Sequence, residues 1–226
     1  MGRTAQKDRG RVSPRQREKF AARRAQLAEA ALQTLSELGY ARTSLREIAQ
    51  NSEFSHGVLH YYFTDKVDLI TYCVRQYKAR CVTRYDRIVT SATTPVELAE
   101  GFAAGLAQTM VEDAAMHRLW YDLRAQSLFE ESFRADVTEI DLSLERMIWR
   151  IVSRLGELRA VPPALSSSIC YALFDGLFQQ NLRRHLAGEA GSDADLSSAV
   201  RKVLELLLPV PAPGPRSAEA PALRRL

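Results

Sequence analysis

Apolar residues recur along most of the chain at the three- and four-residue spacing of amphipathic helices. No segment of useful length alternates apolar and polar residues as a half-buried strand would, so the pattern predicts an all-α fold. Caps and breakers punctuate it: Gly39 is a good helix stop, and Thr94-Pro95 is a clear helix start. We expect helices over residues 14–38, 44–51, 55–63, 65–87, 95–113, 115–129, 132–156, 165–187 and 193–208.

Residues 43–69 place two short helices around a tight polar turn. Ser44 offers a hydroxyl cap to the first helix, and Glu47 follows at the spacing of a capping box. Residues 51–53 form the turn, and Ser55 can cap the second helix. Two such helices cannot bury a core alone, so the preceding helix must support them. The apolar residues expected in this shared core are Phe20, Leu27, Ala31, Leu35, Leu38, Leu45, Ile48, Ala49, Leu59, Tyr62 and Phe63.

The other face of the second helix is left for a partner. Several side chains there are short, and Gly57 has none, so the backbone can approach base edges and phosphates in a DNA major groove. This layout is typical of a DNA-reading helix-turn-helix. Its outward face comprises Ser55, His56, Gly57, Val58, His60 and Tyr61.

The same segment contains a long ungapped motif: Thr43, Ser44, Ile48, Ala49, Ser55, Gly57, Leu59, Tyr62, Phe63, Lys66 and Leu69. In these residues the chain resembles the TetR/AcrR family of bacterial one-component repressors. The resemblance implies an N-terminal three-helix helix-turn-helix DNA-binding domain and a C-terminal helical ligand-binding and dimerisation domain. It also implies that Lys66 contacts a DNA phosphate.

Three residues depart from the motif of that family. Glu53 stands where a turn glycine is usual, which indicates either a backbone that accepts a side chain or some strain. Phe54 replaces a valine, which only puts a larger apolar side chain at the same position. His60 stands where a phosphate-binding tyrosine is frequent, so that contact passes to Tyr61 or becomes pH-dependent.

The outward face and the resemblance together predict a DNA interface. Ser55, His56 and Val58 are expected at base edges. Phosphate contacts are expected from Thr43, Tyr61, Tyr62 and Lys66. The full set of predicted DNA-binding residues is Thr43, Ser44, Ser55, His56, Gly57, Val58, His60, Tyr61, Tyr62 and Lys66.

The distribution of charge agrees with a DNA partner. The chain carries 31 Lys+Arg and 27 Asp+Glu, but residues 1–66 hold 12 basic and 7 acidic side chains, which leaves 19 against 20 for the rest. The excess positive charge therefore lies in the predicted DNA-binding domain. Residues 1–12 are expected to be a disordered basic arm, which is either simply solvated or neutralises phosphates and enters a minor groove.

The domain boundaries follow from pattern and composition. We expect a helix-turn-helix domain over residues 13–66. A helical effector-binding and dimerisation domain should span residues 67–208, because no repeat or linker interrupts them. Residues 209–226 are rich in proline and alanine and are expected to be a disordered tail.

The central helices concentrate aromatic and Met side chains with a few polar groups. For any one of them an ordinary core is the simpler explanation, but the resemblance implies an effector pocket among them. Arg124 and Asp175 have apolar neighbours, so they either pair within the protein or bind polar groups of a ligand, while Gly176 favours close helix packing. The lining favours a small, largely apolar or aromatic ligand. The predicted ligand-binding residues are Phe102, Met110, His117, Trp120, Tyr121, Arg124, Trp149, Tyr171, Phe174, Asp175 and Phe178.

The last two predicted helices are unusually apolar. Either both are simply core, or they form a surface that seeks a partner. The resemblance favours a homodimer held by a four-helix bundle, which would place two recognition helices in successive major grooves of an inverted-repeat operator. The predicted interface residues are Ile169, Leu173, Leu177, Leu182, Leu196, Val200, Leu204 and Leu207.

The chain offers little to support an enzyme or a bound cofactor. It has no phosphate-binding glycine loop, nucleophile elbow or paired-carboxylate signature. His56 and His60 have the spacing of a zinc helix, but no third ligand can be named, so no metal is expected. We therefore expect a repressor that a ligand releases from DNA. The alternative is a helical DNA-binding or protein-interaction factor without a small-molecule effector.

Cysteine content and hydropathy favour a cytoplasmic protein. Cys73, Cys81 and Cys170 are few and odd in number, as expected of reduced thiols. No apolar segment is long enough to cross a membrane, and the arginine-rich start lacks the apolar stretch of a signal peptide. We expect no membrane partner.

Overall fold

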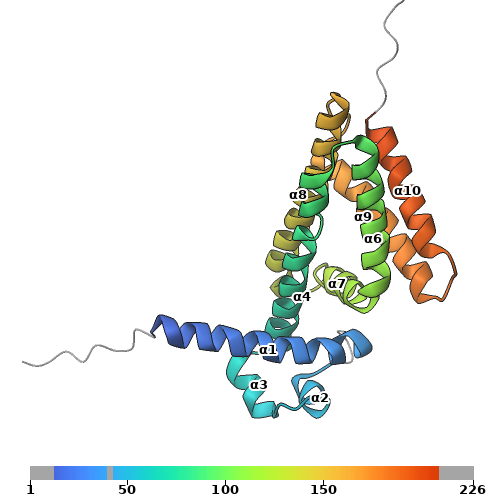
Figure 1. Ribbon diagram of the computed structural model, residues 1–226. Helices are drawn as coiled ribbons and strands as arrows, with labels where there is room; N and C mark the ends of the chain where they lie inside the picture. Colours follow the sequence, from blue (N-terminus) through green and yellow to red (C-terminus); the bar gives the residue numbers. More distant parts are fainter. Residues whose placement is uncertain (1–12, 40–42, 209–226) are drawn as a thin grey trace, which may run out of the picture.

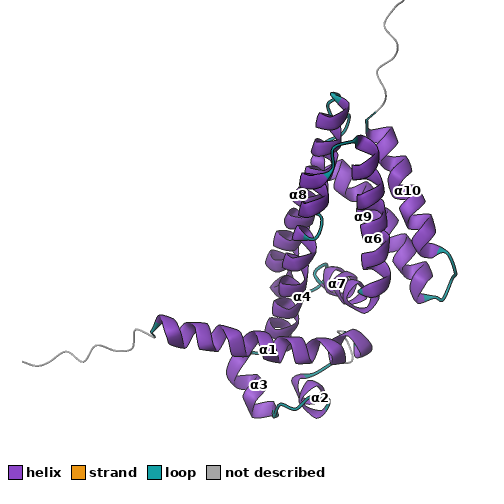
Figure 2. Cartoon of the chain, in the orientation of Figure 1, coloured by secondary structure: helices purple, strands orange, loops and turns teal. Residues whose placement is uncertain are grey.

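The structure, a computed structural model, describes residues 13–39 and 43–208 of the chain. Over these residues it consists of α-helices, one short 3-10 helix and loops, without a β-strand (Figure 2). The predicted all-α fold is confirmed. The arm expected over residues 1–12 and the tail expected over 209–226 lie outside the described residues.

Three helices form the N-terminal part of the molecule, which we call the head. They are α1 (Pro14–Leu38), α2 (Leu45–Gln50) and α3 (His56–Tyr62). A capping box between Ser13 and Gln16 starts α1, and Gly39 ends it with a φ of 75°, a conformation that suits glycine. The hydroxyls of Ser44 and Ser55 cap α2 and α3. Local chemistry thus sets the starts of all three helices and the end of α1.

The core of the head follows most of the apolar pattern, although Leu38, Ala49 and Tyr62 are only half-buried. Phe20 was expected in this core, but its side chain is exposed. Its ring instead rests on Tyr61 and Tyr62, with centroids 6.1 and 4.7 Å away. The reason is that the first half of α1 extends beyond the other two helices (Figure 1). The residues buried in the core of the head include Leu27, Ala31, Leu35, Leu45, Ile48, Leu59 and Phe63.

The remaining elements form a helical body above the head. They are α4 (Lys66–Thr83), α5 (Asp86–Ser91), α6 (Pro95–Glu112), α7 (Ala114–Gln126), the 3-10 helix η1 (Glu131–Phe133), α8 (Arg134–Arg159), α9 (Ser167–Leu186) and α10 (Ser192–Leu207). Helix α1 packs against α4 and α7 and crosses the end of α4 that points toward the head (Figure 1). On the far side of the body, α10 packs against α6 and α9. The head and the body are therefore joined through α4 and α7.

The helix expected over residues 65–87 is in fact two helices. Helix α4 ends at Thr83, and α5 starts after Tyr85. Tyr85 is buried with its ring 5.2 Å from that of Phe102, and Arg84 bonds to Thr109 and Asp113. These contacts with distant residues turn the chain where the sequence has no breaker.

The end of α8 also differs from the expected residue 156. The helix continues to Arg159 and closes with Ala160 in the left-handed region at φ 54°. The N–H of Ala160 donates to the carbonyl of Glu157, and that of Val161 donates to Gly156, which is the Schellman pattern. A non-glycine residue therefore occupies a position that usually belongs to glycine.

Candidate DNA-binding surface and effector cavity

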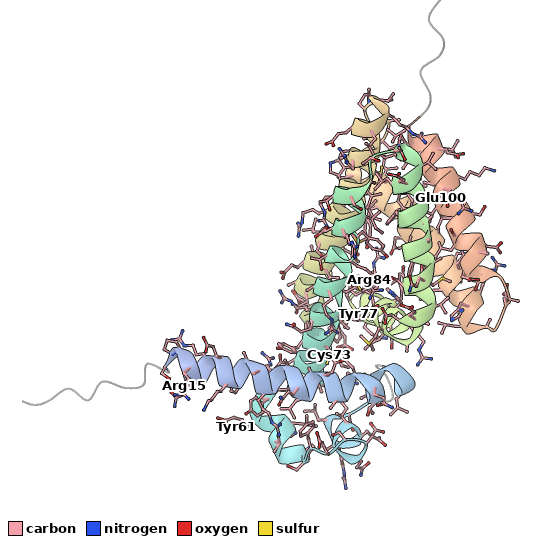
Figure 3. The ribbon with its side chains drawn as sticks, viewed as in Figure 1. Arg15, Tyr61, Cys73, Tyr77, Arg84 and Glu100 are labelled. Atoms are coloured by element: carbon pink, nitrogen blue, oxygen red, sulfur yellow. The ribbon has the colours of Figure 1, made fainter. Side chains whose placement is uncertain are left out.

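Helix α3 presents its predicted face to solvent. Ser55, His56, Gly57 and His60 are exposed, and Val58 is half-buried. Tyr61 is 72% exposed and lies on the side of the head away from the body (Figure 3). The structure thus brings the proposed base-reading residues onto one open surface.

Gly57 leaves the backbone of α3 accessible. A Cβ atom built at this position would meet nothing within 4 Å. Residues 13–39 and 43–208 do not require glycine there, because an alanine would clash with none of them. The missing side chain instead lets a partner approach the helix backbone closely.

The two histidines of α3 contact each other. Their Nε2 atoms lie 3.2 Å apart, and the ring centroids are 4.4 Å apart. When both rings are neutral, one Nε2 donates and the other accepts. His60 is therefore turned toward His56, which supports a transfer of the phosphate contact from His60 to Tyr61.

Thr43 and Glu53 require revision of the sequence-based expectations. The Thr43 side chain is buried, and its hydroxyl donates to the carbonyl of Gly39 at 2.6 Å. This bond holds the connection between α1 and α2, so we remove Thr43 from the phosphate-binding set. Among the non-glycine residues of the described segments, only Ala160 has a positive φ. Glu53 thus occupies an ordinary backbone conformation, and the interpretation that it is strained is wrong.

Three further residues of the predicted DNA-binding set remain at least partly exposed. Ser44 is exposed at the start of α2, and Lys66 is the half-buried first residue of α4. Tyr62 is half-buried beneath the ring of Phe20. All three lie at helix ends within or next to the head.

Basic side chains extend the positive surface along α1. Arg15, Arg17 and Lys19 are exposed on the part of α1 that projects from the head, as the label of Arg15 shows in Figure 3. Arg23 stacks on the ring of Phe54 at 4.8 Å. Arg24 instead forms an ion pair with Asp68 and does not add to this surface. The exposed basic residues leave a strip of positive charge along the first half of α1.

The body contains a cavity of about 60 Å³ between five helices and the α4–α5 turn. Its walls are mostly aromatic and aliphatic. They are formed by Lys78, Cys81, Tyr85, Leu106, Thr109, His117, Trp120, Tyr121, Leu144, Met147, Ile148, Tyr171, Phe174, Asp175 and Phe178.

Most of the predicted ligand-binding residues meet at this cavity. His117, Trp120, Tyr121, Tyr171, Phe174, Asp175 and Phe178 line it. Arg124 does not line the cavity, but its Nη1 donates to Asp175 Oδ2 at 2.6 Å. Most of the residues that we predict to bind a ligand therefore lie at or next to one cavity.

Phe102, Met110 and Trp149 do not line the cavity. Phe102 and Met110 are completely buried in the core, where the ring of Phe102 packs edge-on between those of Tyr85 and Phe174. Trp149 is half-buried and packs against the core outside the cavity wall. Helical spacing identifies a buried face but does not distinguish core from cavity.

The sequence analysis missed several cavity residues, and Lys78 is the most informative. It follows Ile70 and Val74 at four-residue spacing and so continues the buried stripe of α4. A lysine at such a position is a detectable signal. The other missed residues are Cys81, Tyr85, Leu106, Thr109, Leu144, Met147 and Ile148.

Arg124 joins two carboxylates at the cavity wall. Its Nε lies 3.3 Å from Asp141 Oδ2, in addition to the bond with Asp175. The hydroxyl of Tyr121 donates to Asp175 at 2.9 Å, and that of Tyr171 donates to Asp141 at 2.6 Å. Burial lowers the pKa of Arg124, but the hydrogen bond and charge of Asp175 outweigh it and raise this pKa. Arg124 and Asp175 are therefore paired within the protein.

A second polar group at the cavity joins α4 and α7. Lys78 Nζ lies 3.3 Å from His117 Nδ1, and His117 Nε2 lies 3.1 Å from the hydroxyl of Tyr77. Burial, followed by the charge of Lys78, lowers the pKa of His117 well below its ordinary value. The imidazole is thus neutral, with Nδ1 accepting from Lys78 and Nε2–H donating to Tyr77.

The predicted dimer interface is only partly exposed. Ile169 and Leu173 on α9 are 48% and 41% exposed, and Leu177 is half-buried. Five predicted residues instead face the core of their own protomer, because α9 and α10 turn their main apolar stripes toward the rest of the body. Those five, which we remove from the interface, are Leu182, Leu196, Val200, Leu204 and Leu207.

One exposed apolar residue of α10 was missed. Leu206 is 71% exposed and adjoins the buried Leu207, whose carbonyl accepts a hydrogen bond from Ala164 just before α9. This bond brings the C-terminal end of α10 to the N-terminal end of α9. Leu206 therefore lies at the same end of the body as Ile169.

The described residues meet neither the requirements of a metal site nor those of a membrane-spanning helix. Over residues 13–39 and 43–208, no three His, Cys, Asp or Glu side chains converge as a metal site would require. None of the helices described is both long and apolar enough to cross a membrane.

The sequence is similar to known regulators of transcription. Residues 27–73 match the family described as "Bacterial regulatory proteins, tetR family". The chain is 29% identical over 171 residues to the HTH-type transcriptional regulator BetI of Burkholderia thailandensis, which covers 74% of this chain and 83% of that protein. With BetI of Burkholderia pseudomallei it shares 29% identity over 192 residues, covering 83% and 94%.

Solved structures show the same fold at low sequence identity. A TetR transcription regulator from Haloarcula marismortui superposes with a TM-score of 0.69 at 17% identity, over 84% of this chain and all of that one. The regulator FadR from Bacillus subtilis, solved in complex with stearoyl-CoA, gives a TM-score of 0.58 at 16% identity, covering 80% and 96%.

These findings agree with the helix-turn-helix geometry of the head. Proteins of the matched family bind DNA and small-molecule effectors and work as dimers. The chain belongs to the tetR family of bacterial regulatory proteins and is a DNA-binding regulator of transcription rather than an enzyme.

Proposed function

We propose that this protein is a cytoplasmic repressor that binds an inverted-repeat operator as a homodimer and leaves it when a small, largely apolar or aromatic molecule enters the cavity. One observation carries the proposal. The helices that line the cavity include α4 and α7, and both pack against α1 of the head. A ligand in the cavity would therefore touch the two helices that hold the head in place.

Helix α4 is the more direct of the two connections. Its first half buries Leu69, Ile70 and Val74, and the Cys73 thiol lies 3.3 Å from the Ala28 carbonyl of α1. Its second half contributes Lys78 and Cys81 to the cavity. A rotation or shift of α4 in the body would thus be passed directly to the head.

The size of the cavity supports a change of shape on binding. Ligand sites usually enclose at least roughly 300 Å³, whereas this cavity holds about 60 Å³. A ligand must therefore displace aromatic side chains from the walls. We propose that the expanded form holds the two heads at a spacing that no longer fits successive grooves, so that ligand and operator oppose each other.

The DNA contacts that we propose follow the exposed surface of the head. Ser55, His56 and Val58 would read base edges. Ser44, Tyr61, Tyr62 and Lys66 would contact phosphates, joined by the strip of basic residues on α1. A dimer held through the exposed residues of α9 would set two copies of α3 about 34 Å apart, one turn of DNA.

A binding experiment tests the DNA part of the proposal. We would measure fluorescence anisotropy of the intergenic DNA upstream of the gene and of a scrambled duplex, at two salt concentrations. Preference for the natural DNA by at least roughly 1000-fold would support a specific operator. Equal and strongly salt-sensitive binding to both duplexes would contradict specific recognition of that DNA.

The same complex tests the effector part. Small aromatic and aliphatic compounds are added to the protein bound to its operator. Release of the DNA by a compound that also binds the free protein would support a ligand-controlled repressor. Specific DNA binding that no such compound weakens would favour the alternative, a regulator without a small-molecule effector.

A further inference from the structure

Among the Lys, Arg, Asp and Glu residues whose side chains the structure describes, only Lys78 is buried. It is 4% exposed and forms part of the cavity wall. An ammonium group in such surroundings is unfavourable unless an anion or several hydrogen bonds compensate for the lost water. The groups that contact Lys78 in the free protein therefore show whether its charge is compensated or whether a ligand could supply the missing anion.

The contacts of Lys78 are all with uncharged groups. Its Nζ bonds to the neutral His117 and lies 5.3 Å from the centre of the Trp120 ring and 5.6 Å from that of Tyr77. It forms no ion pair with a carboxylate of the described residues. An ammonium group has three N–H donors, and His117 accepts from one of them.

The carboxylates nearest to the cavity are committed elsewhere. Both oxygens of Asp175 are bonded, one to Arg124 and the other to Tyr121. Asp141 is bonded in the same way, to Arg124 and Tyr171. These acids attract Lys78 only from a distance, and the side chains that bind them hold them away from it.

We propose that the effector is a small carboxylate, or a compound with an equivalent anionic group, and that Lys78 is its counter-ion. The proposal rests on the function proposed above and specifies the chemistry of its ligand. The carboxylate would accept the hydrogen bonds that Lys78 has left to donate. The apolar part of the molecule would lie among Trp120, Phe174 and Phe178, which also line the cavity.

A cationic effector fits this cavity less well. Aromatic walls attract cations, but the ammonium of Lys78 already lies within cation–π distance of Trp120. A second positive charge in a cavity of this size would be repelled by the first. A neutral ligand would leave the ammonium as it is in the free protein. Only an anion makes the buried charge favourable.

Two matched series of probes test the charge of the ligand in the wild-type protein. Benzoate, benzamide and benzylamine share one ring, and hexanoate, hexanamide and hexylamine share one alkyl chain. Isothermal titration calorimetry measures their affinity for the full-length protein without DNA. We expect each acid to bind at least about 10-fold more tightly than its amide, as hydrogen bonds to a charged group imply, and more tightly than its amine.

A substitution tests the role of Lys78 itself. The variant Lys78→Met keeps the length of the side chain and removes the charge, and Lys78→Gln serves if the first variant does not fold. Either should weaken binding of the acids by at least about 10-fold and leave the amides unchanged. The control Lys202→Met removes an exposed lysine of α10, a helix that does not line the cavity, and should bind all probes as the wild type does.

Three results would overturn the proposal. These are amides or amines that bind as tightly as the acids, an equal loss for every probe in Lys78→Met, and no binding of either acid at millimolar concentration. The DNA-release experiment separates this proposal from the proposed function. If the acids bind through Lys78 but leave the operator complex intact, the proposed release of DNA by the ligand is contradicted, whereas the anionic ligand site is not. Release by amines or amides, but not by acids, would contradict only the anionic ligand.

Discussion

The buried charge of Lys78 opposes folding of the free protein. Burial lowers the pKa of Lys78 from 10.5 to about 8, although Cys81, Asp175, Asp141 and Asp113 act in the opposite direction. The unfolded chain keeps the proton up to the ordinary pKa of lysine. The free-energy penalty of burial is therefore complete below about pH 8 and disappears as the pH rises toward 10.5.

We expect Lys78→Met to stabilise the protein at neutral pH. The free energy of unfolding should increase by roughly 2–3 kcal/mol at pH 7, and this gain should shrink as the pH rises above 8. Urea unfolding of both proteins from pH 7 to pH 10 measures the difference. Other titrating groups such as His117 and Tyr77 are common to both proteins. A loss of stability at pH 7 would mean that the ammonium already has an anionic partner in the free protein.

Side chains of the head should divide into two kinds by their effect on DNA binding. Lys66→Ala should weaken binding to every sequence and reduce the salt dependence by about one counterion, because it removes a phosphate contact. His56→Ala should instead change the preference among operator variants. Anisotropy titrations at several salt concentrations distinguish the two. Lys202→Ala, on α10, is the control. Equal losses on all sequences for His56→Ala would contradict base reading.

Single residues show clearly where sequence patterns stop being informative. Spacing grouped Tyr121, Asp175 and their neighbours correctly in space because aromatic residues recur on the inward faces of α7 and α9. It could not exclude Phe102, since a core residue and a cavity residue have the same period. Thr43 was misassigned because its hydroxyl bonds to Gly39, a contact that depends on how α1 ends.

At the scale of the helices, local signals predicted starts better than ends. The capping residues Ser44, Ser55 and Thr94 start helices where the sequence indicated. The break between α4 and α5 has no local signal, because it is fixed by contacts with α6 and α7. Tertiary contacts of this kind cannot be read from one segment alone.

At the end of α8, substitutions at Gly156 and Ala160 should change the stability of the protein in opposite directions. A Cβ atom at Gly156 would lie 2.8 Å from the carbonyl oxygen of Val161. Gly156→Ala should therefore destabilise the protein by about 1–3 kcal/mol. Ala160→Gly should stabilise it by roughly 0.5–1 kcal/mol, because it relieves the left-handed conformation. Thermal unfolding measures both. A melting temperature that Gly156→Ala leaves unchanged would show that the loop after α8 adjusts freely.

At the scale of the whole molecule, the apolar surplus of α9 and α10 has two destinations. The stripe of α10 that includes Leu196 and Val200 completes the core of the protomer. Ile169 and Leu173 of α9 remain outside it, and Gly176 has nothing within 4 Å of a Cβ built on it. Close packing at Gly176 would therefore require a second subunit. The sequence predicted the surplus but not how it divides, because both stripes have helical period.

A charge on the exposed face of α9 should separate the subunits. We expect Leu173→Asp to be monomeric at micromolar concentration and to bind the operator more weakly, because two linked heads would no longer act together. Analytical ultracentrifugation measures the association. Leu142→Asp, at an equally exposed position on α8, is the control and should remain dimeric. A dimeric Leu173→Asp would place the interface elsewhere.

The positions of the two tryptophans give the molecule an optical property. Trp120 is buried in the cavity wall, and Trp149, the only other tryptophan of the chain, packs outside it. Any compound that fills the cavity must change the surroundings of one indole and leave the other nearly as it was. With Trp149→Phe, the remaining emission comes from the cavity alone. The unlabelled protein thereby becomes a fluorescent reporter with which a compound collection can be screened before the operator is known.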